Sequence, residues 1–107
     1  MSNIELPDQL IGNYLSSLVN QFFKILPLKE SNEKSLPVYI KSLQREIIGF
    51  KSLVDGLGYD RDIIVLLSIL EYMILEDPDV SIVKTEVFRA INICKKLNER
   101  FEEVTHR

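Results

Sequence analysis

Residues that could carry out catalysis or bind a metal are scarce in this chain of 107 residues. Histidine occurs once, as His106, and cysteine occurs once, as Cys94. A catalytic triad needs a histidine beside a nucleophile, and a histidine-based metal site needs more than one such ligand. Cys94 falls on the apolar spacing of a predicted helix, which is typical of a small buried hydrophobe. We therefore expect a non-enzymatic protein with no catalytic residue, no metal site and no cofactor.

One acidic segment resembles the start of a calcium-binding loop. Asp77, Asp79 and Ser81 match the first, third and fifth positions of an EF-hand loop. The sixth position requires Gly and the twelfth requires Glu, but Ile82 and Phe88 stand there. Capping of a helix N-terminus explains these acids better.

The elements that must position any site are helices, because apolar residues recur at alternating spacings of four and three. Short breaks containing Gly and Pro interrupt these runs, which argues against an extended coiled coil because a coiled coil would continue. No segment alternates with period two for long enough to suggest a strand. We predict an all-α, antiparallel four-helix bundle that forms a single domain over 1–107. The helices are expected at about 8–26, 36–56, 61–76 and 80–104. The predicted seams are Ile11, Leu15, Leu18, Phe22 and Ile25; Leu36, Ile40, Leu43, Ile47, Phe50, Val54 and Leu57; Ile63, Leu67, Leu70 and Ile74; and Val83, Val87, Ala90, Cys94, Leu97, Phe101 and Val104.

Residues that interrupt or cap helices separate these segments. Pro27 is expected to end the first helix near residue 26. Ser35 is expected to cap the second helix, which the glycines of 56–58 end. Asp60 can cap the third helix, and 77–79 (Asp-Pro-Asp) ends it and opens the fourth. Short connections predict that neighbouring helices run antiparallel.

The run from Ile63 to Leu75 is apolar except for Ser68 and Glu71. A membrane-spanning helix takes about 20 apolar residues, and charged residues flank this shorter run on both sides. The N-terminus shows no secretory signal, and a single cysteine fits a reducing compartment. We expect a cytoplasmic protein with no membrane contact.

Some apolar residues of the third predicted helix are not used by its seam. Val65, Ile69 and Tyr72 lie opposite the seam at about 100° per residue. Either this helix is central and surrounded by the other three, or the strip binds another chain. A contiguous exposed apolar strip is unusual on a monomer. We therefore expect a protein-interaction module that self-associates or binds a protein partner.

The other helices carry similar residues. Phe88 projects away from the fourth seam, and Ile48 has a similar place on the second helix. Gly49, beside Ile48, costs up to about 1 kcal/mol relative to alanine, and close approach of a neighbouring helix is a common reason for such a glycine. The candidate interface residues are Val65, Ile69, Tyr72, Phe88 and Ile48.

Two alternatives remain open. A small DNA-binding regulator could use the 80–104 helix in a helix-turn-helix, with Lys84, Arg89 and Lys96 as nucleic-acid contacts. Acidic residues on the same helix and a net charge of −3 argue against it. A ligand carrier or enzyme with a pocket between helices is disfavoured because few polar residues point inward on any seam.

Three fragments add a resemblance. They are FKILPL (Phe23 to Leu28), LPVYIKSLQREIIG (Leu36 to Gly49) and VKTEVFRAINICKKL (Val83 to Leu97). The chain resembles small all-helical proteins encoded by phages and prophages of Gram-positive bacteria, a group with no assigned activity. The resemblance implies a cytoplasmic, mobile-element setting and a partner in host or defence machinery. No functional residue is implied by it.

Overall fold

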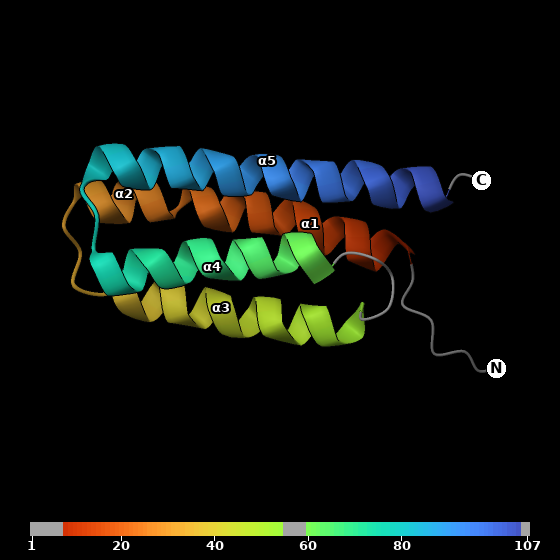
Figure 1. Cartoon of the computed structure of the whole chain (residues 1–107), viewed down its shortest axis with the longest axis horizontal. Coiled ribbons are helices and arrows are strands. Elements are labelled where there is room, and N and C mark those ends of the chain that lie inside the picture. Colours follow the sequence, from red (N-terminus) through yellow and green to blue (C-terminus); the bar gives the residue numbers. More distant parts are fainter. Residues whose placement is uncertain (1–7, 55–59, 106–107) are drawn as a thin grey trace.

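The helices of the structure, a computed structural model, follow one another as α1 (Asp8–Phe23), α2 (Ile25–Glu30), α3 (Leu36–Leu53), α4 (Asp60–Glu76) and α5 (Val80–Thr105). The structure describes residues 8–54 and 60–105, with side chains over 10–54 and 61–100. In this part of the chain, α1 and α2 follow each other in one line and together form the first helical course of the bundle (Figure 1). With α3, α4 and α5 they make an all-α antiparallel four-helix bundle, which confirms the predicted fold class. The predicted glycine stop at 56–58 and His106 lie outside the described residues, and so does the side chain of Asp60.

Pro27 divides the first helical course without ending it. It has no N–H to donate to the carbonyl of Phe23, so the hydrogen-bond ladder is interrupted between α1 and α2. Lys24, at the junction, keeps helical angles of φ −65° and ψ −18°. Pro27 then lies in the first turn of α2, where a missing N–H is tolerated. The prediction that Pro27 ends the helix near residue 26 is therefore wrong.

Asn32 provides the stop instead. Its φ of 54° is left-handed, a conformation that asparagine tolerates. The Asn32 N–H donates to the carbonyl of Lys29 at 3.0 Å, and the Glu33 N–H donates to that of Leu28 at 3.0 Å, which is the Schellman pattern. Ser35 precedes α3 but makes no side-chain cap, because its backbone is helical and not extended as in an N-cap.

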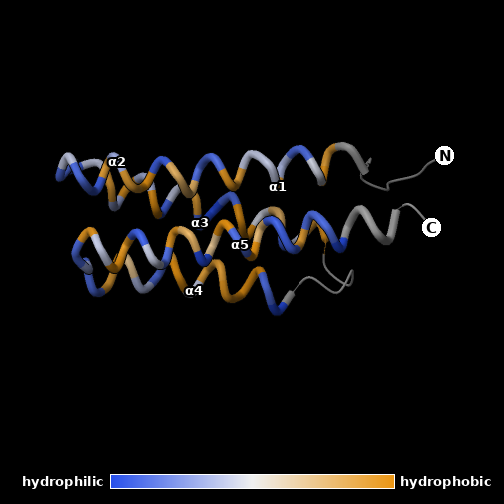
Figure 2. Tube along the Cα trace, turned by 90° about the horizontal axis from the view of Figure 1, so that it is seen from above, coloured by the Kyte–Doolittle hydropathy of each residue, from blue (hydrophilic) through white to orange (hydrophobic). Residues whose placement is uncertain are grey.

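The four helical courses lie along the long axis of the bundle (Figure 1). α5 packs on α1, α2 and α4, and α3 packs on α4 and α2. The first helix thus lies beside the last, and α3 and α4 form the other pair (Figure 1). The hydropathy colouring in Figure 2 alternates along each helix, as expected for elements with one buried face.

The seams predicted for the first, second and fourth helical segments lie in the core. Their described members are buried, apart from Leu36, which is partly buried. Among the described residues no polar or charged residue is buried. Apolar contact therefore holds the described core together, and its buried members are Ile11, Leu15, Leu18, Phe22, Ile25, Ile40, Leu43, Ile47, Phe50, Val54, Ile63, Leu66, Ile69, Leu70, Met73, Val83, Val87, Ala90, Ile91, Cys94 and Leu97.

The buried face of α4 differs from the predicted seam. Ile63 and Leu70 are buried as predicted, but Leu67 and Ile74 are only partly buried. Leu66, Ile69 and Met73 are buried in addition. The reason is that α4 packs against both α3 and α5, so its buried face is wide and rotated from the predicted line. The helix itself was therefore predicted correctly, but the side of the helix that faces the core was not.

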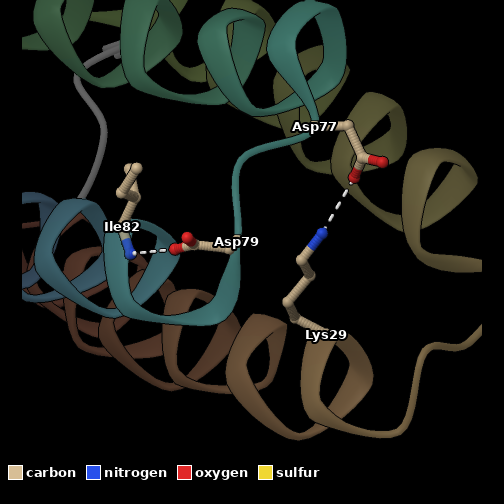
Figure 3. A network of polar contacts seen from close by, with 4 residues as sticks. All are labelled: Lys29, Asp77, Asp79 and Ile82. Atoms are coloured by element: carbon tan, nitrogen blue, oxygen red, sulfur yellow. Dashed lines mark hydrogen bonds and ion pairs between the residues drawn. The ribbon is translucent and has the colours of Figure 1, made fainter.

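The α4–α5 connection is held by polar contacts (Figure 3). Asp79 accepts hydrogen bonds from the Ser81 hydroxyl (2.8 Å) and the Ile82 N–H (3.2 Å), and these bonds lower the pKa of its carboxyl. Asp77 has a left-handed φ of 43° and pairs with Lys29 of α2 at 2.8 Å. The capping interpretation is confirmed for Asp79, while Asp77 ties α2 to the connection.

Candidate functional site: a surface spanning α4 and α5

A groove runs between α4 and α5 on the outside of the bundle. Its α4 wall uses positions 65, 68, 69 and 72, whose spacing places them on one helical face. Its α5 wall consists of Glu86 and Arg89, and its volume is about 360 Å³. We call this the α4–α5 groove, and its lining is Val65, Ser68, Ile69, Tyr72, Glu86 and Arg89.

Three predicted interface residues meet in the α4–α5 groove, but they differ in exposure. Tyr72 is exposed at 39%, and Val65 is partly buried. Ile69 is only 2% exposed and belongs to the core. The prediction of Ile69 as an exposed contact is wrong, because the rotation of α4 turns it inward between its neighbouring helices. Of these three residues, Tyr72 is therefore the best placed to reach a partner.

The polar groups of the α4–α5 groove are partly satisfied within the chain. Arg89 donates to Glu86 at 3.1 Å, three residues earlier on α5. The Ser68 hydroxyl donates to the carbonyl of Ile64 at 2.9 Å. The Arg89 side chain is 56% exposed, so its ion pair stabilises the fold little. A guanidinium group has five N–H donors, so Arg89 has further donors with which it could contact a partner.

A second groove follows α5 itself. Lys84, Phe88, Asn92 and Lys96 recur every four residues and form one stripe. We call this the α5 groove; its volume is about 700 Å³ and its lining is Lys84, Thr85, Phe88, Arg89, Asn92, Ile93 and Lys96. Arg89 lines both grooves, so the two are neighbours.

The predicted exposure of Phe88 is confirmed at 42%. Its ring packs edge-on against Phe23 of α1, with centroids 5.7 Å apart and planes at 85°. Phe23 is itself 41% exposed and was not a predicted site residue. It follows the seam residue Phe22 in sequence, and only the packing of α1 on α5 brings it to Phe88.

Ile48 lies apart from the other predicted contacts. It is 56% exposed on α3, and it lines neither of the two grooves. The α4 and α5 residues therefore form one surface without it. We call this the aromatic–basic surface; it comprises Tyr72, Lys84, Phe88, Arg89 and Lys96 of α4 and α5, together with Phe23 of α1, whose ring contacts Phe88.

The alternative nucleic-acid contacts also come together. Lys84, Arg89 and Lys96 all line the α5 groove. However, α4 and α5 pack on each other and run antiparallel (Figure 1), whereas the helices of a helix-turn-helix cross at a steep angle. The helix-turn-helix interpretation is therefore wrong, although the cationic stripe on α5 is real.

Reactive chemistry is sparse over the described residues. Cys94 is buried, as predicted, and burial raises the pKa of its thiol to about 12, so it stays protonated. The described residues contain no group of three or more His, Cys, Asp or Glu side chains arranged to hold a metal ion. Within that part of the chain, none of the helices combines the length and apolar character needed to cross a bilayer.

Comparison of the chain with protein-family models, with curated proteins and with solved structures finds no match.

Proposed function

We propose that this protein is a non-enzymatic interaction module that binds another protein through its aromatic–basic surface. The observation that carries the proposal is the placement of two half-exposed aromatic residues, Tyr72 and Phe88, at grooves that share Arg89. Tyr, aromatic residues in general and Arg are enriched at protein interfaces and at the residues that dominate binding energy.

The charges of the surface indicate the partner's chemistry. Lys84, Arg89 and Lys96 surround Phe88, so a complementary partner presents carboxylates around an apolar contact. The partner is either a second copy of this chain or a host or defence protein, in line with the phage and prophage resemblance of its three fragments. The same resemblance supports a cytoplasmic setting.

Two variants test the proposal without disturbing the core. Tyr72→Asp and Phe88→Asp each place a charge at a side chain about 40% exposed, so both variants should stay folded. Loss of an aromatic hot spot costs about 2 kcal/mol or more, which is roughly 30-fold in affinity. Ile48→Asp is the matched control, because Ile48 is also half-exposed but lies away from the surface.

The measurement has two parts. Light scattering over a range of protein concentrations shows whether the wild-type chain self-associates, and affinity capture from the native host shows whether a heterologous partner binds. Both variants should weaken the association that is found, while Ile48→Asp should retain it. Equal association by Tyr72→Asp, Phe88→Asp and the wild type, all folded, would refute this surface as the interface.

A second candidate function, DNA binding along α5, rests on the cationic stripe of Lys84, Arg89 and Lys96. Titration of duplex DNA at two salt concentrations separates the two candidates, because phosphate-driven binding must weaken as salt rises. Lys96→Ala would then reduce the affinity and the salt dependence together. Absence of DNA binding at the lower salt concentration would remove this candidate.

A further inference from the structure

The edge of the bundle between α1 and α3 holds a different kind of cavity. α1 packs on α5 and α3 packs on α4, and a groove of about 680 Å³ opens between α1 and α3. This volume falls within the roughly 300–1,000 Å³ of small-molecule sites. Its apolar walls include Leu10, Ile11, Phe50 and Leu53. We call it the α1–α3 groove. The helix pair α1 and α3 lies across the bundle from the pair α4 and α5 (Figures 1 and 2).

Gly49 helps to keep this groove open. A Cβ atom added at Gly49 would meet no atom within 4 Å, although the residue lines the groove in the interior of α3. The interpretation that a neighbouring helix approaches Gly49 closely is therefore wrong. No packing contact with the described residues requires glycine here, and the missing side chain widens the space in front of it.

Tyr14 contributes its ring to the wall of the groove. Its ring stacks on Phe50 across the two helices, with centroids 4.5 Å apart and planes tilted by 33°. The hydroxyl oxygen is buried and has no hydrogen-bond partner among the described residues, so it lies out of reach of a ligand in the groove. Burial, and secondly the negative charge of Glu46, raise the pKa of Tyr14, so the hydroxyl keeps its proton.

Among the described residues that line the groove, Glu46 is the one that carries a charge. Its carboxylate accepts hydrogen bonds from the neutral Gln21 amide, at 3.1 and 3.3 Å. An amide donor leaves the negative charge of Glu46 uncompensated. The groove therefore combines apolar and aromatic walls with one anion.

From this combination we propose that the α1–α3 groove binds a small amphiphilic amine. The apolar body of the ligand lies along Leu10, Phe50 and Leu53, and its ammonium group donates to the Glu46 carboxylate. The ammonium group supplies a positive partner for the Glu46 carboxylate, and the Tyr14 ring offers a cation–π contact. An alcohol of the same shape cannot compensate the charge, and a carboxylate would be repelled.

A titration followed by two-dimensional amide NMR tests the inference with n-octylamine hydrochloride as the probe. n-Octanol and sodium octanoate are the comparison ligands of equal chain length. Octylamine should shift the amide signals of Gly49, Leu53 and Leu10, and should bind about 10-fold more tightly than octanol, as expected for a hydrogen bond to a charged group. Octanoate should bind more weakly than octanol.

Two variants assign the binding to this groove. Gly49→Leu fills the groove without meeting an existing atom at its Cβ, so it should fold and lose octylamine binding at least 10-fold. Glu46→Gln keeps the shape and should make octylamine and octanol bind equally. Ile48→Leu, at the exposed neighbouring position, is the matched control and should bind as the wild type does.

Three results would overturn the inference: no binding of octylamine to the wild type, equal affinity for octylamine and octanol, or undiminished binding by folded Gly49→Leu. The Glu46→Gln variant keeps the test decisive if Gly49→Leu does not fold, because preserved selectivity in that variant would equally overturn it. The inference does not depend on the proposed protein interface, which uses the opposite edge of the bundle.

Discussion

Replacement of Gly49 by alanine should stabilise the protein. Gly49 lies inside α3 (Leu36–Leu53), four residues before its last residue, and an added Cβ would meet nothing within 4 Å. The substitution therefore brings no steric cost and no new burial. Only the difference in helix propensity remains, which is about 0.8–1.0 kcal/mol in favour of alanine.

This free-energy gain corresponds to a measurable shift. Domains of this size shift their Tm by about 4–8 °C per kcal/mol, so Gly49→Ala should raise Tm by roughly 3–8 °C. Urea unfolding followed by circular dichroism would give the free energy of unfolding directly, and the m-value should not change. Gly12→Ala is the matched control, because its Cβ would make an ordinary contact at 3.6 Å with the Asn98 side-chain oxygen.

The result that would refute this reasoning is a Gly49→Ala protein no more stable than the wild type while Gly12→Ala is stabilised. Such a result would show that Gly49 contacts something that the isolated chain does not contain. If the deficit grew with protein concentration, the contact would be with a second copy of the chain.

Three further outcomes are expected. Ile69→Asp should unfold the protein, because it places an unpaired charge at a core position with 2% exposure, whereas Tyr72→Asp should melt near the wild-type temperature; circular dichroism melts compare them. Cys94 should react with a thiol reagent at mildly alkaline pH only as fast as the protein unfolds, since burial raises its pKa to about 12; modification of the folded protein within the mixing time would contradict this. Asp79→Ala should lower Tm near neutral pH. Folding lowers the pKa of Asp79 below its ordinary value of 3.8. The ionised carboxylate therefore stabilises the folded state above that pH, and this stabilisation is lost as the pH falls through the folded pKa. The Tm difference from the wild type should therefore shrink in acid, and a difference that widened there would be inconsistent with this assignment.

Much of the fold follows from sequence because each of three helical courses has one clear apolar stripe. Leu18, Ile47 and Val87 illustrate this, since each was placed on its seam by spacing alone and is buried. Asp79 was likewise recognisable as a helix cap from its residue type and position. These features are local, so a single sequence contains the information that specifies them.

The candidate sites are less predictable. Tyr72 and Phe88 could be proposed as surplus apolar residues, but their shared neighbour Arg89 and the ring contact with Phe23 depend on how α4 and α1 pack on α5. The α1–α3 groove gave no sequence signal beyond Gly49. Its lining comes from two helices, α1 and α3, and the sequence of neither helix indicates that a groove will remain between them.

The sequence by itself determined the helices, most of their ends and the buried face of every course with a single apolar stripe. It could not determine the rotation of α4, because the run from Ile63 to Leu75 is apolar on nearly every side and several rotations bury similar surface. The tertiary structure decided that rotation, since α4 must face α3 and α5 together, and this turned Ile69 into the core and left Tyr72 outside. It also decided that Pro27 interrupts a helix and does not end it, because α2 remains packed on α5 beyond the break.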